Sequence, residues 1–215
     1  KSLWQQAALR QLLDKREQFT AASGESLTET LVLAAFILGN GPLAEHLAED
    51  LPETSPMNTF LQAMKTREPQ QAIDALKPWN NAETERQILA MNAVGAALGV
   101  TGARGQAVQV LSNCARRYPD NTVSLFNIAL VFRRADMPRF AAQALRKLTA
   151  VYPENIEAHA LMFQILREAG MQSEARRAAE VMYALFPDTH RAALAIATAY
   201  VDARQPEQAR TALET

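Results

Sequence analysis

The stretch Ala150-Val151-Tyr152-Pro153-Glu154 contains a motif, an aromatic residue followed by proline and an acidic residue, that occurs three times in this chain. Its copies are Tyr118-Pro119-Asp120, Tyr152-Pro153-Glu154 and Phe186-Pro187-Asp188, at a constant spacing of 34 residues. Proline has no N–H and drives the preceding residue out of the α-helical region. Each copy therefore predicts the end of a helix, with the aromatic side chain packed inward.

Other positions repeat in phase with this motif. Four columns follow the 34-residue spacing: Ala107, Ala141, Ala175 and Ala209; Leu111, Leu145 and Leu213, with Ala179 as the exception; Val94, Ile128, Met162 and Ile196; Leu98, Phe132, Leu166 and Tyr200. Small residues stand beside the third column at Gly95, Ala129 and Ala197. A fixed period of this length is typical of repeat proteins, in which each unit buries its apolar face against the next. The chain is therefore predicted to be a solenoid.

Each repeat contains two helices. Leu125, Ile128, Ala129 and Phe132 follow the i, i+3, i+4, i+7 spacing of one helical face. A second such face follows the break at residues 136–138. In the next repeat, Gly170 suits a helix C-terminus that needs positive φ, and Ser173 is the predicted N-cap of the following helix. The predicted unit is an antiparallel helix pair.

The first 86 residues match the repeat less closely. Ser55-Pro56 and Glu68-Pro69 each predict a helix start, and the helix after Pro69 fits the later columns with a one-residue insertion. Residues 26–29 (Ser-Leu-Thr-Glu) are interpreted as a capping box leading into a helix over 31–38. Residues 2–20 predict one more amphipathic helix.

We therefore expect a single solenoid over residues 1–215 with no interdomain linker. Divergent repeats occupy 1–86, and clear repeats occupy 88–121, 122–155, 156–189 and a truncated 190–215. Solenoids normally end in a polar cap, and none follows the last repeat. The expectation is a fragment of a longer polypeptide, or an end covered by another copy.

The amino-acid composition limits which classes of function are plausible. The chain has a formal net charge of −1, with 48% hydrophobic and 21% charged residues. Residues 1–87 carry a charge of −4 and residues 88–215 a charge of +3. Near-neutral charge argues against a general nucleic-acid or membrane-surface binder, and no apolar run reaches the roughly 20 residues of a spanning helix. Neither cytoplasm nor periplasm is distinguished by this composition.

Chemistry-bearing motifs are weak. His46 and Glu49 supply too few ligands for a metal site, and residues 99–105 lack the Lys-Ser/Thr ending of a phosphate loop. The single cysteine, Cys114, falls in a core column with Leu148 and Met182. The expectation is no catalytic residue, no metal and no cofactor, and hence not an enzyme.

Four basic pairs, 116–117, 133–134, 146–147 and 176–177, are candidates for a nucleic-acid surface. Most fall on second helices, near Glu154, Glu174 and Glu180. A solvated outer face is the favoured interpretation, although Arg133 and Arg134 end a first helix.

The columns resemble the tetratricopeptide repeat family, a 34-residue helix–turn–helix unit. Gly95, Leu98, Ala107, Leu111 and Pro119 carry the resemblance in the first clear repeat, and Ile128, Ala129, Phe132, Ala141, Leu145 and Pro153 in the second. The aromatic residue found early in the family's first helix is missing. The resemblance implies a right-handed superhelical solenoid whose first helices line a groove that holds a partner segment.

By this resemblance, the groove would be lined by Leu89, Asn92, Phe126, Asn127, Leu130, Arg133, Gln164, Arg167 and Thr198, with Ala96 and Leu194 beside them. Phe126 has an alternative role in packing against the adjacent repeat. The lysines of a carboxylate clamp are absent, since Asn92, Ala96, Asn127 and Glu157 stand at the matching positions.

The leading hypothesis is a non-catalytic scaffold or adaptor that binds a peptide or helix of a protein partner, within a larger bacterial protein or assembly. The first alternative is self-assembly through uncapped ends, as a module of secretion, envelope or exopolysaccharide machinery. The second is an RNA-binding helical repeat.

Overall fold

The computed structural model describes residues 25–37, 40–81, 84–119 and 121–214, so the predicted helix over residues 2–20 lies outside it. The chain divides into two compact units, Lys1–Tyr118 (unit 1) and Pro119–Thr215 (unit 2). The described residues form helices and connecting turns, without a strand among them. The prediction of an all-α fold is confirmed.

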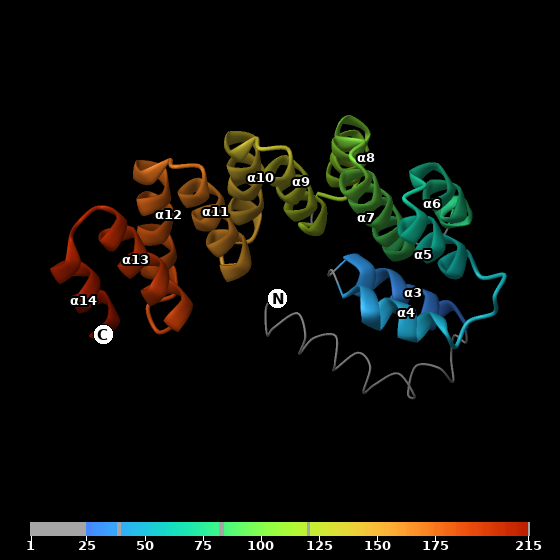
Figure 1. Ribbon diagram of the computed structural model, residues 1–215, viewed down its shortest axis with the longest axis horizontal. Coiled ribbons are helices and arrows are strands. Elements are labelled where there is room, and N and C mark those ends of the chain that lie inside the picture. The colour runs from blue at the N-terminus through green and yellow to red at the C-terminus, as the bar shows by residue number, and fades with distance from the viewer. Residues whose placement is uncertain (1–24, 38–39, 82–83, 120, 215) are drawn as a thin grey trace. The chain divides into compact units, whose positions relative to one another are not determined.

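Unit 1 is built from paired helices. They are α3 (Glu25–Ile37), α4 (Gly41–Ala48), α5 (Pro56–Thr66), α6 (Pro69–Ala75), the 3₁₀ helix η1 (Lys77–Asn81), α7 (Thr84–Thr101) and α8 (Arg104–Arg117). Helix α3 packs against α4, α5 against α6 and α7 against α8, and α3 also contacts α7 (Figure 1). The predicted pairing of helices holds in this more divergent half as well.

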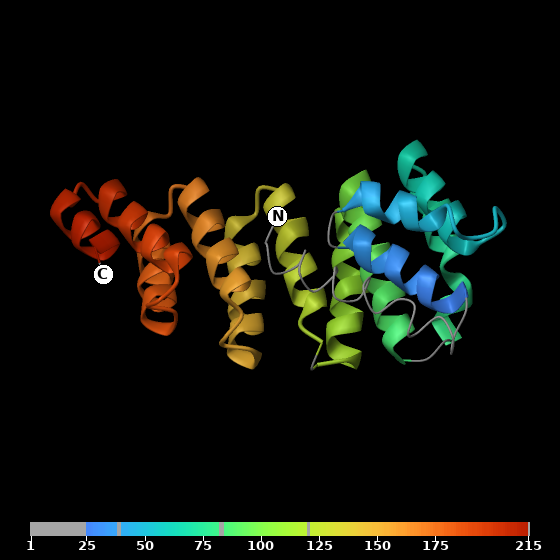
Figure 2. The ribbon, with the colours of Figure 1, turned by 90° about the horizontal axis from the view of Figure 1, so that it is seen from below.

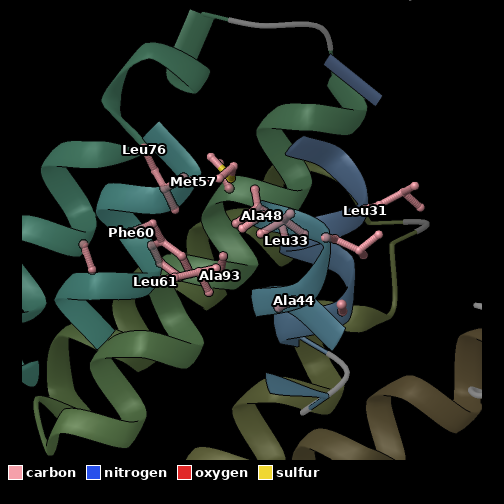
Figure 3. Packing of buried hydrophobic residues seen from close by; sticks show 14 of the residues in the cluster. Leu31, Leu33, Ala44, Ala48, Met57, Phe60, Leu61, Leu76 and Ala93 are labelled. Carbon is pink, nitrogen blue, oxygen red and sulfur yellow. The ribbon is translucent and has the colours of Figure 1, made fainter. Parts of the chain in front are cut away.

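The core of unit 1 is continuous across these pairs. Phe60 of α5 is fully buried, and its ring meets that of Phe36 of α3 edge to face at 4.9 Å. Figure 3 shows Met57 and Phe60 of α5 gathered with Ala93 of α7, all in one buried cluster. Such burial stabilises by about 1.5–3 kcal/mol for each large side chain, before the entropy cost of ordering it.

Two of the three helix starts predicted in unit 1 agree with the structure. Helix α5 begins at Pro56 with Ser55 as N-cap, whose Oγ accepts from the Met57 N–H at 3.2 Å, and α6 begins at Pro69. The predicted capping box is wrong, because Ser26 lies inside α3. Glu29 instead accepts a hydrogen bond from the Ser55 hydroxyl at 3.1 Å. This contact fixes the start of α5 against α3.

Unit 2 contains three helix pairs. They are α9 (Val123–Arg134) with α10 (Pro138–Val151), α11 (Ile156–Glu168) with α12 (Gln172–Leu185), and α13 (His190–Asp202) with α14 (Pro206–Glu214). Each second helix also packs against the next first helix, α10 on α11 and α12 on α13. Figure 2 shows the six helices following one another in chain order. Stacking of this kind gives unit 2 its solenoid architecture.

The aromatic-proline motif ends second helices as predicted. Tyr118, Tyr152 and Phe186 are the C-caps of α8, α10 and α12, each with φ near −130°. Their side chains differ, however. Tyr152 is 50% exposed, so the prediction that the motif's aromatic packs inward is wrong at this position. Phe186 does pack inward, with its ring 5.8 Å from that of the buried His159.

The turns inside the pairs repeat as regularly as the helices. Positive φ recurs at Gly102, Asp136, Gly170 and Arg204, each 34 residues apart, and at Arg67, 35 residues before Gly102. Four of these turns share a backbone bond across five residues, from Glu68 to Ala63 at 2.8 Å and from Met137 to Phe132, Met171 to Leu166 and Gln205 to Tyr200 at 2.9 Å each. This is the Schellman arrangement. The 35-residue step at Arg67 places the predicted one-residue insertion in unit 1.

The predicted helix end at Gly170 is confirmed, but the following N-cap is not Ser173. Helix α12 begins at Gln172, so Ser173 lies in its first turn. The Schellman turn sets this start, because it leaves only Met171 between the left-handed residue and the helix.

The positive φ of Arg204 leads to a stability prediction. We expect Arg204→Gly to raise the free energy of unfolding by up to about 1 kcal/mol, because glycine adopts the left-handed region without the Cβ strain that other residues carry. Gly170→Ala should lower it by about 1 kcal/mol, since a Cβ there meets no atom within 4 Å and only backbone strain changes. Urea unfolding measures both. A loss of stability in Arg204→Gly would contradict the assignment.

Candidate partner-binding surface

The three first helices of unit 2 share one partly exposed stripe. On each of these helices, residues at i, i+4 and i+7 lie on one face. Because the repeat is 34 residues long, the corresponding faces of the three helices lie side by side. The resulting surface, here called the first-helix face, consists of Phe126, Leu130 and Arg133 on α9, Ala160, Gln164 and Arg167 on α11, and Leu194, Thr198 and Val201 on α13. Leu194 and Val201 are 62% and 61% exposed. The surface mixes apolar and polar groups.

Ion pairs between successive repeats border this face. Arg133 donates through Nη2 to both carboxylate oxygens of Glu168, at 2.8 and 2.9 Å. One repeat further, Arg167 donates through Nε to Asp202 Oδ2 at 2.5 Å and through Nη2 to Oδ1 at 3.2 Å. In both cases the arginine of one first helix reaches the acidic residue 35 positions later. The C-terminal ends of α9, α11 and α13 are thereby linked.

A further ion pair lies at the opposite end of these helices. Arg191 at the start of α13 pairs with Glu157 at the start of α11, one repeat earlier. Helices α11 and α13 are therefore tied at both ends. Fixed spacing between first helices makes the face between them a pre-arranged surface, which lowers the ordering cost of binding.

The second pair has an electrostatic consequence. Hydrogen bonding from Arg167 lowers the pKa of the Asp202 carboxyl, and the same bonds raise the pKa of Arg167. Both groups thus remain charged and engaged with each other over the ordinary pH range. A partner carboxylate would have to displace Asp202 to reach this arginine.

Two residues predicted to line the groove do not reach the surface. Asn92 is 1% exposed, and its side-chain amide donates to the Ile88 carbonyl at 2.9 Å and approaches Cys114 Sγ at 3.7 Å. Asn127 is 5% exposed. Neither side chain can contact a partner without unpacking its helix, so the prediction of an amide rim at these two positions is wrong.

The other predicted residues are distributed as follows. Phe126, Leu130 and Thr198 are half-buried on the first-helix face, and Gln164 is exposed but donates to Glu168 Oε1 at 2.8 Å. Leu89 belongs to unit 1, where it packs against the buried core. Arg133 and Arg167 are occupied by intramolecular carboxylates. What remains available for apolar contact is Phe126, Leu130 and Leu194.

The sequence reasoning did not identify the acidic partners Glu168 and Asp202. A signal for them exists, because Arg133 to Glu168 and Arg167 to Asp202 share one spacing of 35 residues. Opposite charges one repeat plus one residue apart, on helices already predicted to be neighbours, indicate an inter-repeat pair. Searching the 34-residue register for charge as well as for apolar columns would have found it.

The prediction for Cys114 is confirmed, since Cys114, Leu148 and Met182 are each at most 1% exposed. Among the described residues, no three His, Cys, Asp or Glu side chains come together as metal ligands would. A search of the same residues for a helix of membrane-spanning length and hydrophobicity finds none.

Paired helices in a fixed register, with first helices that follow one another along unit 2, define a helical-repeat fold. No protein-family model matches the sequence, and a comparison with curated proteins gives no match.

Solved structures provide the relatives of this fold. The chain is similar to a crystal structure of MamA, with a TM-score of 0.54 and 17% identity over 72% of this chain and 90% of that one. It is similar also to residues 41 to the end of MamA from Desulfovibrio magneticus RS-1, with a TM-score of 0.53 and 17% identity over 74% of this chain and 89% of that one. At this identity the likeness shows the fold.

Proposed function

We propose that this protein is a non-catalytic scaffold of tetratricopeptide type, which holds a peptide or helix of a protein partner on the first-helix face of unit 2. The observation that carries the proposal is the group of apolar side chains on the first-helix face, the half-buried Phe126 and Leu130 on α9 and the exposed Leu194 on α13, on helices that are linked by ion pairs. A surface held in place before binding suits recognition of a segment with apolar anchors.

The paired charges define the chemistry of that segment. Arg133 and Arg167 already have carboxylate partners, so an acidic tail gains little from them. Apolar side chains that cover Leu130 and Leu194 gain about 25 cal/mol for each Å² removed from water. The segment expected here is therefore an amphipathic helix or extended peptide with apolar anchors, rather than a terminal carboxylate.

Affinity capture from lysate of the source cells, read by mass spectrometry, tests this proposal. The variant is Leu194→Arg, because this side chain is 62% exposed and its replacement is expected to leave the fold intact. The matched control is Leu185→Arg on α12, a leucine 49% exposed outside the first-helix face. Circular dichroism checks both variants.

A protein retained by the wild type and the control but lost with Leu194→Arg supports recognition on the first-helix face. Equal retention by both variants would place recognition elsewhere and overturn the proposal.

A further inference from the structure

Helix α10 carries a row of positive charge that has no ion-pair partner in the part of the chain that the structure describes. Unit 2 as a whole has 11 basic and 11 acidic residues, yet α10 contains Arg139, Arg146 and Lys147 and no acidic residue. None of the three forms an ion pair with another described residue, whereas Arg133, Arg167, Arg176, Arg191 and Arg210 all do. Helix α9 also has basic residues and no acidic one, but its Arg133 pairs with Glu168.

The exposed side of α10 is a single stripe. Arg139, Gln143, Arg146, Lys147 and Ala150 are all exposed and follow the spacing of one helical face, about 16 Å long. The opposite side, including Ala141 and Leu145, is buried. Apolar groups stand at both ends of the stripe, since Phe140 is 50% and Val151 54% exposed. Cations between two apolar ends suit an acidic surface with apolar flanks.

The narrowness of the stripe favours a polypeptide over a bilayer. An anionic membrane surface is a plane and would meet the neighbouring second helix as well. Helix α12 carries Glu174 and Glu180 against Arg176 and Arg177, so it adds no net charge. A surface one helix wide is better matched by a cleft or a segment of protein.

Unit 1 of the same chain presents such a surface. A cleft of about 560 Å³ lies between α4 and α5, lined by Glu45, Glu49 and Glu53 with one base, Lys65. Lys65 pairs with Glu45 at 3.3 Å, which leaves Glu49 and Glu53 without a lysine or arginine partner among the described residues. The apolar Ala48, Leu51 and Leu61 also line this cleft. Its chemistry complements that of the α10 stripe.

We propose that the α10 stripe of one copy docks in the α4–α5 cleft of a second copy, so that the protein associates with itself head to tail. The two surfaces are different, so the contact is heterologous, and repeated contacts generate rings or open chains. Neither surface includes the first-helix face, and association therefore leaves the proposed partner-binding face free.

The test is a charge exchange followed by sedimentation velocity at several protein concentrations. The first variant is Arg146→Glu with Lys147→Glu, and the second is Glu49→Lys with Glu53→Lys. We expect the wild type to associate at low salt, and its apparent Kd to rise at least about tenfold between 50 and 300 mM NaCl, because exposed charges are screened. Each variant alone should be monomeric.

Mixing the two variants is the decisive arm. The reversed stripe of the first variant matches the reversed cleft of the second, and the unchanged stripe of the second matches the unchanged cleft of the first. The mixture should therefore associate, with the two variants alternating, whereas each variant alone does not. The control is Arg177→Glu with Arg204→Glu, which changes the net charge of unit 2 by the same amount but at positions outside α10. This control should associate as the wild type does.

Two results would overturn the proposal. One is a wild type that is monomeric at every concentration, including the case in which α10 instead binds phosphatidylserine vesicles. The other is a mixture of variants that stays monomeric while the wild type associates.

Discussion

Leu145→Ala is expected to lower the free energy of unfolding by about 2–5 kcal/mol, the range for truncating a fully buried leucine. Leu145 is 0% exposed and lies on α10, which packs against both α9 and α11. Its removal leaves a cavity that two helix pairs share, and close-packed side chains recover such space only in part. Chemical unfolding followed by circular dichroism measures the loss.

The matched control is Leu213→Ala, the same substitution at the same repeat position of α14. Leu213 is 60% exposed, so we expect a change within about 0.5 kcal/mol. The two variants share residue type, repeat column and helix class, and they differ in burial. Similar losses in both would mean that the 34-residue column does not place Leu145 at the joint between repeats.

Gly95→Ala is expected to lower the free energy of unfolding by about 1–3 kcal/mol, the cost of overpacking a core. A Cβ at Gly95 would overlap the Leu111 side chain, which is itself fully buried. Leu111 lies on α8, the partner of α7, so relief requires the two helices to move apart. Helix propensity by itself favours alanine by about 1 kcal/mol, so the steric effect must exceed this gain.

Gly105→Ala separates the two contributions. Gly105 lies in the first turn of α8, and a Cβ there meets no atom within 4 Å. We expect a gain of up to about 1 kcal/mol from propensity alone. If Gly95→Ala also stabilised the protein in thermal unfolding, the close approach of α7 and α8 at this position would be refuted.

Helix boundaries could be predicted because their causes are local. Proline lacks an N–H wherever it stands, so Ser55-Pro56 and Tyr152-Pro153 mark a start and an end irrespective of the rest of the fold. The capping box at Ser26 failed for a related reason. A cap requires the helix to begin at that residue, and α3 extends past it.

The register of the repeat also follows from sequence. Ala107, Ala141, Ala175 and Ala209 are all buried, in both units. The predicted one-residue insertion reappears as the 35-residue step from Arg67 to Gly102. The periodic pattern predicts the register correctly because equivalent positions in each repeat pack against equivalent neighbours and need side chains of similar size.

The binding surface was predicted less well, and helix geometry explains why. Adjacent residues are about 100° apart around a helix, so the side chains of Phe126 and Asn127 leave α9 in clearly different directions. Phe126 is half-buried on the first-helix face, and Asn127 is buried. An error of one residue in the choice of exposed face therefore assigns a buried residue to the polar rim of the predicted groove.

The sequence by itself determined the all-α class, the helix pairs, their 34-residue register and the core columns, because these depend on neighbours within one repeat. Only the tertiary structure decided which polar groups are free. Arg133 and Arg167 have partners 35 residues away, while the cations of α10 have none among the described residues. That difference depends on whether an opposite charge on another helix comes within hydrogen-bond reach, and the packing of neighbouring helices sets this distance.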